Sequence, residues 1–306
     1  MLPYKLKIGD TIGVVSTSDP VSEEKMLDIE SSKEFFENLG FKVKLGKYVK
    51  ANELGYSTSA KNKVEDLNNM FEDKEVKAIF SACGGFNINS VFDYLDYELI
   101  KNNPKIICGY SDATSLINGI YARTGLVTFH GPNFGSLAKT EEGVEEYSRK
   151  EVVKRFIDGN LDLGTDDDEF KTIKPGQAEG VLVGGNLSLI AHLVAGKYKS
   201  DFKDKILFIE EFAWESPAGM VSNYLYYMKQ NGVFDEIKGL WIGNYDNEIA
   251  LEKIVLDTLG DEYDFPIIKS NNFGHVDKKT VVPIGVKARI DTNTDRKIIL
   301  LEDCVR

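Results

Sequence analysis

Short apolar runs and amphipathic stretches alternate through the first 130 residues of the chain. Apolar runs at 11–16, 41–45, 76–81 and 105–108 predict strands, and amphipathic stretches at about 26–39, 59–71, 88–95 and 115–121 predict helices. Strands that alternate with helices form a mostly parallel sheet with helices on both faces. We therefore expect an α/β fold that begins with a doubly wound, Rossmann-like sheet, whose ligand sites lie at the carboxyl ends of its strands.

The pattern changes between residues 139 and 176. A charged helix is predicted from Glu142 to Ile157, followed by the acidic run 166–169 and a Lys-Pro-Gly turn at 174–176. Like charges in series repel and stay hydrated, so the acidic run predicts a solvated face, with cation binding as the alternative. We interpret the whole segment as a surface excursion at a domain boundary.

Short strands separated by glycine-rich turns dominate the remainder of the chain. Strands are predicted at 180–183, 205–209, 239–242 and 281–284, helices near 187–194, 222–230 and 250–259, and a hairpin around 292–295. This pattern predicts a second, β-rich α/β domain. We expect the two domains to span residues 1–160 and 175–306.

Composition excludes several classes of partner. The chain of 306 residues has 37 Lys and Arg against 49 Asp and Glu, a net charge of −12, so we expect no nucleic-acid partner. The first ten residues lack the apolar core of a signal peptide, and no run reaches the roughly 18 apolar residues of a membrane span. We therefore expect a cytoplasmic protein without a membrane partner.

The cysteines and histidines predict neither a disulfide framework nor a metal site. The three cysteines form no CxxC pair, so reduced, buried thiols are expected. The three histidines (His130, His192 and His275) are far apart in the sequence and form no HExxH motif. We expect no bound metal.

The segment around Ser111 has the strongest local signal for catalysis. An apolar strand leads into Gly109-Tyr-Ser-Asp112 and then into a helix, which is the strand–turn–helix context of an exposed nucleophilic serine. The N–H groups at the start of a helix also favour a developing oxyanion. The alternative is that Ser111 merely caps the helix that follows.

Two other strand ends carry candidate groups. Gly84 and Gly85 follow the strand 76–81, and paired glycines let backbone N–H groups approach a ligand, although an ordinary turn is equally compatible. Glu210 and Glu211 follow the strand 205–209, and His275 lies in a loop. Serine, carboxylate and histidine in this order are compatible with a catalytic triad, although a lone histidine is more often structural.

Seven motifs, taken together, resemble one family of serine peptidases. They are Gly84-Gly85, Tyr94-Leu-Asp-Tyr97, Gly109-Tyr-Ser-Asp112, Thr124-Gly-Leu-Val-Thr-Phe-His-Gly-Pro132, Gly184-Gly-Asn-Leu187, Phe208-Ile-Glu-Glu211 and Gly274-His275. In this order they resemble the family of LD-carboxypeptidases and microcin C immunity proteins. The resemblance covers nearly the whole chain and is more specific than any single motif.

The resemblance implies a cytoplasmic, homodimeric hydrolase without a metal or organic cofactor. It implies that Ser111 is the nucleophile, that His275 is the base and that Glu210 orients the base. The backbone N–H groups of Gly85 and Asp112 are the implied oxyanion donors.

The family's two branches differ in substrate. Muropeptide carboxypeptidases of the family tend to carry Arg before the glycine pair, where this chain has Cys83. Its motifs are closer to the immunity branch, which cleaves the bond between an aspartate and a modified adenylate. Gly84, Phe86, Glu211 and Trp214 are then candidates for substrate binding, with Tyr245 as a further aromatic candidate and Glu211 alternatively a solvated carboxylate.

Three functions therefore remain open at this point. The first is hydrolysis of a peptidyl nucleotide, and the second is hydrolysis of a small muropeptide. The third belongs to another class, namely a non-catalytic module that binds a nucleotide or peptide at the same glycine-rich loops.

Overall fold

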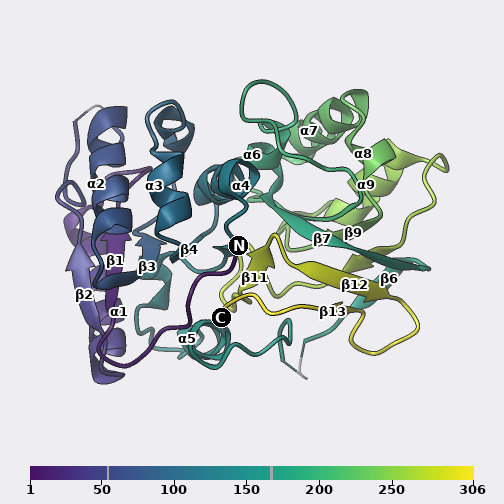
Figure 1. Ribbon diagram of the computed structural model, residues 1–306. Coiled ribbons are helices and arrows are strands. Elements are labelled where there is room, and N and C mark those ends of the chain that lie inside the picture. The colour runs from purple at the N-terminus through teal and green to yellow at the C-terminus, as the bar shows by residue number, and fades with distance from the viewer. Residues whose placement is uncertain (54, 166–167) are drawn as a thin grey trace.

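The computed structural model describes residues 1–53, 55–165 and 168–306, which form two sheets side by side (Figure 1). The first sheet has the strand order β11-β5-β4-β3-β1-β2. Its strands are β1 (Thr11–Val15), β2 (Lys42–Leu45), β3 (Val76–Ser81), β4 (Ile106–Gly109), β5 (Thr128–His130) and β11 (Val282–Ile284). β1 to β5 are parallel and β11 is antiparallel to β5. The predicted doubly wound, mostly parallel sheet is confirmed.

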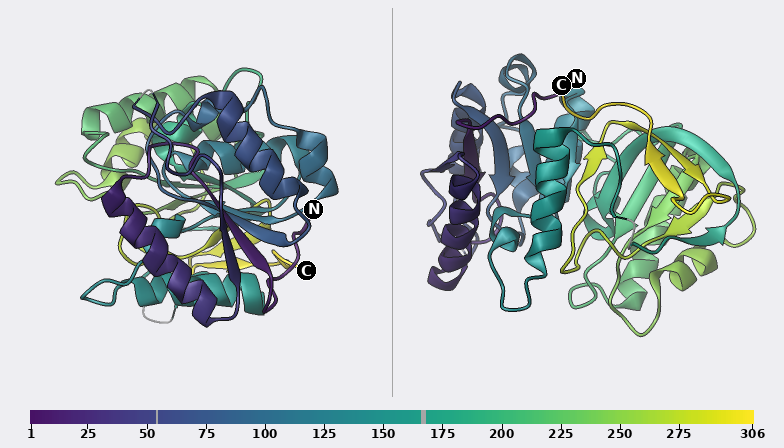
Figure 2. Two further views of the ribbon diagram at one scale, coloured as in Figure 1. Left: turned by 90° about the vertical axis from the view of Figure 1, so that its left-hand side faces the viewer. Right: turned by 90° about the horizontal axis from the view of Figure 1, so that it is seen from below.

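Helices cover both faces of this sheet. α2 (Ala60–Glu72), α3 (Tyr97–Asn102) and α4 (Ala113–Thr124) lie on one face, and α1 (Glu23–Asn38) and α5 (Glu145–Val153) lie on the other (Figures 1 and 2). Ser22 and Ser59 cap the N-termini of α1 and α2 by accepting hydrogen bonds from backbone N–H groups. Because both faces are covered, β1 and β4 are buried along their whole length, which explains their continuous apolar sequences.

The predicted helix at 88–95 is wrong in extent. Residues Ile88–Val91 form only a short 3₁₀-helix, η1, after Asn87 in the left-handed region at φ 80°. A separate helix, α3, then begins at Tyr97, and its N-cap is Asp96, whose side chain accepts from the N–H of Leu99. That cap, which competes with continuation of the earlier turn, was the signal missed.

The predicted charged helix at 142–157 is present with changed bounds. α5 begins at Glu145, and the chain continues as a π-helical turn, η3 (Lys154–Asp158). A second 3₁₀-helix, η2 (Phe134–Leu137), precedes it. Of the acidic run, residues 166 and 167 lie outside the described residues, and Asp168 accepts from the hydroxyl of Tyr147 at 2.6 Å.

The second sheet has the strand order β13-β12-β7-β8-β9-β10-β6. Its strands are β6 (Lys171–Lys174), β7 (Gln177–Asn186), β8 (Lys205–Glu210), β9 (Gly239–Ile242), β10 (Ile267–Lys269), β12 (Lys287–Asp291) and β13 (Ile298–Leu300). Its helices are α6 (Leu187–Ala191), α7 (Ala218–Gln230), α8 (Val233–Glu236) and α9 (Leu251–Leu259). β7 to β10 are parallel, and β12 and β13 form the predicted hairpin. The prediction of a second, β-rich α/β part is confirmed.

Helix α4 and strand β11 join the two sheets. The Asn118 side chain on α4 donates to Gly184 O on β7 at 2.9 Å, and Asn186 N donates to the hydroxyl of Thr114 at 3.1 Å. β11 follows the loop that carries His275, and Val282 pairs with His130 at the end of β5. These contacts place the carboxyl ends of β4, β5 and β8 close to one another. Within the described residues, none of the helices has the length and apolarity needed to cross a membrane.

Candidate active site

Ser111 occupies a strained turn between β4 and α4. Its φ of 60° lies in the left-handed region, which is uncommon for a residue with a side chain and is often found at functional sites. The N-cap residue of α4 is Asp112, and Ser111 contributes only its carbonyl, which accepts from Thr114 N at 2.9 Å. The alternative that the Ser111 hydroxyl serves as a helix cap is therefore wrong.

The glycine pair lies directly against this serine. A Cβ at Gly84 would lie 3.0 Å from Ser111 Oγ. Gly85 has a φ of 128°, and a Cβ there would lie 2.0 Å from Asp19 Oδ1, so a side chain does not fit. In the part of the chain that the structure describes, the N–H groups of Gly85 and Asp112 donate to no protein acceptor. Two backbone donors thus remain available beside the serine, as an oxyanion hole requires.

Three acidic or basic side chains hold the 84–88 loop, and sequence reasoning missed two of them. Asp19, after β1, accepts from Phe86 N at 3.3 Å, and Asp112 accepts from Ile88 N at 2.9 Å. The buried ammonium of Lys63 on α2 donates to the side chain of Asn87 at 3.1 Å. Asp19 follows β1 and the 84–88 loop follows β3. The strand order of the sheet reverses between these two strands, and ligands of such sheets usually bind in the crevice at this point. The polar segment 16–19 after the apolar strand β1 was the available signal for Asp19, whereas Lys63 had none.

Burial shifts the pKa values of the two charged groups in this network. It raises the pKa of Asp112 to about 6 and lowers the pKa of Lys63 to about 8. Each charge partly offsets the shift of the other, because the carboxylate of Asp112 favours the charged ammonium of Lys63.

Glu210 and His275 form a buried hydrogen-bonded pair at the end of the second sheet. Glu210, the last residue of β8, accepts through Oε2 from both His275 Nδ1, at 2.7 Å, and His275 N, at 3.0 Å. Gly274, at φ 89°, lets the loop come this close, because a Cβ there would lie 2.3 Å from Glu210 Cγ. The imidazole stacks on Phe212 at 4.7 Å and meets the ring of Tyr110, the neighbour of Ser111, at 5.1 Å.

The negative charge of Glu210 and the positive charge of protonated His275 stabilise each other. Burial alone would raise the pKa of Glu210, but its interactions with His275 and His130 outweigh burial and hold that pKa well below its usual range. Burial alone would lower the pKa of His275, but the Glu210 carboxylate outweighs it and raises that pKa. Glu210 is therefore ionised at neutral pH, and it favours the imidazolium form of His275.

Glu211 points away from this pair and anchors helix α6. Its carboxylate accepts from Asn186 Nδ2 at 3.0 Å and from Ser188 N at 2.8 Å. It is buried, so the alternative of a solvated carboxylate is wrong. Burial and the neighbouring charge of Glu210 raise the pKa of Glu211.

The aromatic candidates differ in accessibility. Trp214 is 90% exposed and Phe86 is 62% exposed, so both can meet a ligand. Tyr245 is buried, and its hydroxyl donates to Ser216 O at 2.8 Å, which commits it to the packing of the protein.

One cavity lies beside the candidate site, and a larger one lies away from it. A cavity of about 300 Å³ lies beside the serine, and its lining includes Cys83, Gly84, Tyr110 and Asn133. Burial raises the pKa of the Cys83 thiol to about 11, so this thiol is neutral at physiological pH.

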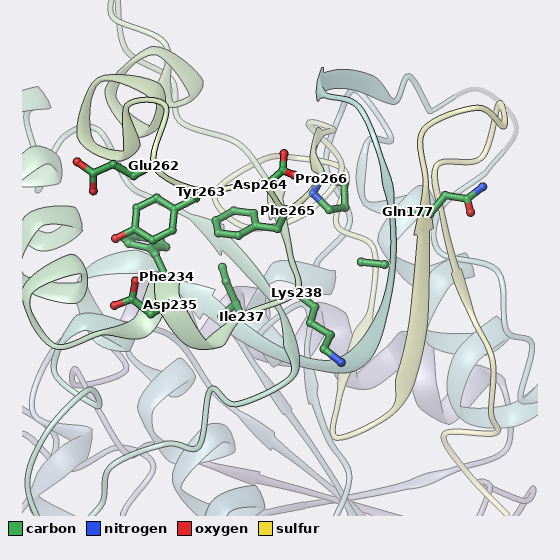
Figure 3. Close-up of a pocket in the computed structure, with 11 residues that line it drawn as sticks. Gln177, Phe234, Asp235, Ile237, Lys238, Glu262, Tyr263, Asp264, Phe265 and Pro266 are labelled. Atoms are coloured by element: carbon green, nitrogen blue, oxygen red, sulfur yellow. The ribbon is translucent and has the colours of Figure 1, made fainter.

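A wider cavity of about 550 Å³ opens on the second sheet, between residues 177–178 and 234–266 (Figure 3). Its lining holds none of the predicted site residues, and we assign it no role.

The cysteines are unpaired, and the described residues hold no group of three or more His, Cys, Asp or Glu side chains arranged for a metal ion. Cys108 and Cys304 are buried as expected, whereas Cys83 is half-buried.

A strained serine beside free backbone donors, next to a buried Glu–His pair at the strand ends of an α/β fold, is typical of hydrolases. Comparison with known proteins specifies the class. The sequence profile of the LD-carboxypeptidase N-terminal domain, peptidase S66, matches residues 12–131, and that of the LD-carboxypeptidase C-terminal domain matches residues 179–290. The chain therefore belongs to the LD-carboxypeptidase family and is a hydrolase.

Individual relatives come from both branches of this family. A Bacillus subtilis (strain 168) protein named "Probable murein peptide carboxypeptidase" is 32% identical, over 97% of this chain and 93% of that protein. The microcin C7 self-immunity protein MccF of Escherichia coli is 29% identical, over 95% of this chain and 93% of its own length. The solved structure of MccF in complex with glutamyl sulfamoyl guanosine matches with a TM-score of 0.91 at 26% identity, covering 100% of this chain and 99% of that one.

Proposed function

We propose that the chain is a serine hydrolase whose triad is Ser111, His275 and Glu210. The observation that carries the proposal is the 2.7 Å hydrogen bond from His275 Nδ1 to Glu210 Oε2, beside the strained turn of Ser111. This bond fixes the imidazole so that Nε2 is the atom left to accept a proton. The described residues contain no hydrogen bond between Ser111 and His275, and such bonds often form only with substrate in place.

The proposed reaction is acyl transfer through a covalent intermediate. His275 Nε2 takes the proton of Ser111 Oγ as this oxygen attacks the substrate carbonyl carbon. The N–H groups of Gly85 and Asp112 then stabilise the resulting oxyanion. The imidazolium gives its proton to the leaving nitrogen, the C–N bond breaks, and water activated by the same imidazole hydrolyses the acyl-enzyme.

The proposed substrate is the amide-like bond between an aspartate and a modified adenylate. Two findings on one relative support it: MccF is 29% identical to this chain, and its structures include one in complex with aspartyl sulfamoyl adenosine. The exposed aromatic rings of Phe86 and Trp214 provide surfaces on which a base can stack. Gly84 lines the cavity beside the serine.

A muropeptide with an LD bond is the second candidate substrate. The 32% identity to the murein peptide carboxypeptidase of Bacillus subtilis favours it. Cys83, which is neutral, stands against it, because the resemblance implies an arginine at this position in that branch.

A side-by-side turnover assay tests both proposals. Purified enzyme is offered an aspartyl adenylate amide and an LD-tetrapeptide, with Ser111→Ala as the inactive control and a fluorophosphonate probe as a test of serine activation. Faster turnover of the adenylate supports the first substrate, and faster turnover of the tetrapeptide supports the second. Failure of the probe to label the wild-type protein while it labels a known serine hydrolase would contradict the triad.

We also propose that residues 1–160 and 175–306 are separate domains of a cytoplasmic homodimer. The matched family profiles at 12–131 and 179–290 lie inside these boundaries, although β11 adds to the first sheet. Support for the dimer comes from the family resemblance alone. Sedimentation equilibrium tests the dimer, and cell fractionation tests the location.

A further inference from the structure

His130, at the end of β5, is a buried histidine that the proposed triad does not use. It is 0% exposed, and in the described part of the chain neither of its ring nitrogens has a hydrogen-bond partner. A buried polar group without a partner is costly, so such groups are rare and call for an explanation. One of the two nitrogens, Nε2, faces another buried atom that also lacks a partner within the described residues.

The facing group is the free oxygen of the proposed triad carboxylate. Glu210 uses Oε2 for both bonds to His275, and its buried Oε1 has no hydrogen-bond partner among the residues that the structure describes. His130 Nε2 lies 3.8 Å from this Oε1. Within the described residues, a ring nitrogen and a carboxylate oxygen that both lack partners thus face each other about 1 Å beyond ordinary hydrogen-bond length.

The imidazole of His130 is held in this orientation by its surroundings. The rings of Phe208 and Phe273 meet it edge-on at 5.6 Å and 6.1 Å. A Cβ at Gly185 would lie 2.9 Å from His130 Cδ2, so the backbone of β7 closes a third side. Packing therefore directs Nε2 toward Glu210.

We propose that His130 is a positioning residue, whose Nε2–H donates to Glu210 Oε1 when the two sheets approach slightly during turnover. The inference rests on the proposed function, since it concerns the carboxylate that orients the base. His130 belongs to the first sheet and Glu210 to the second. The contact therefore couples the position of the Glu–His pair to the sheet that carries Ser111.

Such a hydrogen bond would change how strongly the Glu210 carboxylate stabilises the protonated form of His275. A second donor on Oε1 disperses the carboxylate charge, which weakens its hold on the imidazolium and eases the return of the proton to the leaving group. The other charged or titratable groups around this pair are the following: Glu211, Glu215, Tyr110 and Lys279. They are present in every variant compared below.

Two pairs of variants separate hydrogen bonding from packing. His130→Phe keeps a ring of similar shape but removes the donor. The amide nitrogen of His130→Gln takes the place of Nε2, whereas that of His130→Asn takes the place of Nδ1, which does not face Glu210. His192→Phe, at an exposed histidine on the second sheet's side of the molecule, is the control for loss of an imidazole.

We expect His130→Phe to lower kcat by roughly 10- to 100-fold, as for a lost hydrogen bond to a charged group, with KM within about twofold. The acidic limb of kcat/KM moves to higher pH, because Glu210 then stabilises the imidazolium more strongly. His130→Gln restores most of kcat, and His130→Asn does not. His192→Phe leaves both quantities unchanged.

Equal activity of the Gln and Asn variants, or a folded His130→Phe variant within about twofold of wild-type kcat, would overturn the proposal. If His130→Phe does not fold, the Gln and Asn pair still decides. Imidazole ¹⁵N spectra of the wild-type enzyme give an independent answer: a proton on Nε2 is required, and a neutral ring protonated at Nδ1 contradicts it. If Ser111→Ala is inactive while His130→Phe is fully active, only this inference fails, whereas an active Ser111→Ala defeats the proposed function itself.

Discussion

The two halves of the candidate site are built by different means. On the first sheet, the backbone of Ser111 and Gly85 lies in the left-handed region, with φ values of 60° and 128°, and three charged side chains hold the 84–88 loop from outside. On the second sheet, Glu210 and His275 are positioned by a buried, charge-stabilised hydrogen bond. The groups that the first half offers to a substrate are backbone N–H donors, which do not titrate themselves although Asp112 and Lys63 beside them do. The groups that the second half offers are side chains whose own charge changes with pH.

The comparison shows where each half is vulnerable. A backbone-built half loses function when a side chain disturbs the turn or when the nucleophile itself is removed. A charge-built half loses function when either charge changes, even if the shape of the site stays the same. The predictions below test this division, starting with the largest expected effect.

We expect the largest effect from removal of the proposed nucleophile, Ser111. We expect Ser111→Ala to lower kcat by roughly 10⁴- to 10⁶-fold, as when the nucleophile of other triads is removed. The turn should persist, because the Ser111 hydroxyl makes no hydrogen bond within the described residues and its carbonyl still accepts from Thr114 N. Circular dichroism checks the fold, and a folded variant with more than about a tenth of wild-type kcat shows that Ser111 is not the nucleophile.

Substitutions at the adjacent residues Glu210 and Glu211 test the charge-built half, because only Glu210 contacts His275. We expect Glu210→Gln to lower kcat by roughly 10³- to 10⁴-fold, because an amide can hold the wrong imidazole tautomer. Glu211→Gln is expected to lower activity by less than about tenfold but to cost about 1 kcal/mol of stability, since Glu211 accepts from Ser188 N at the start of α6. Kinetics and thermal unfolding of both variants give the comparison. The reverse order of activity loss would mean that the roles of the two carboxylates are exchanged.

The sequence alone predicted the backbone-built half better than the charge-built half. The strand–turn–helix around Ser111 is local, so strand 105–108 and the following helix could be recognised within about 15 residues of sequence. The Glu210–His275 bond joins residues 65 positions apart, and only their order and the family resemblance suggested it. Alternation along a strand did predict that one glutamate reaches His275 and the other does not.

Buried polar contacts between distant elements were beyond sequence reasoning. Lys63 and Asp112 approach the 84–88 loop only because α2 and α4 pack on the same face of the first sheet. The contact between His130 and Glu210 depends on how the two sheets meet. Neither arrangement has a periodic or local pattern that a sequence could reveal.

The pH profile sharpens the contrast between the halves. His275 accepts a proton only when it is neutral, and Glu210 raises its pKa, so kcat/KM is expected to fall as pH decreases through that raised pKa. Glu210→Gln removes the charge that stabilises the imidazolium, so the remaining activity should titrate at lower pH. Steady-state rates between about pH 5 and 9 measure both curves. A flat profile, or one that His275→Ala leaves unchanged, rules out His275 as the base.

The smallest effect on kcat is expected at the exposed side chains of Trp214 and Phe86, because neither ring is one of the proposed reacting groups. Trp214→Ala and Phe86→Ala should change stability by less than about 0.5 kcal/mol, because both side chains are mostly solvated. If one of them stacks on an adenine, its removal raises KM for an aspartyl adenylate by roughly 5- to 100-fold, as for other base–aromatic stacks, while kcat stays constant. KM for an LD-tetrapeptide, which has no base, should stay unchanged in the same variant. Equal KM values for wild type and both variants on the adenylate would show that neither ring binds the base, and would weaken the case for a nucleotide substrate.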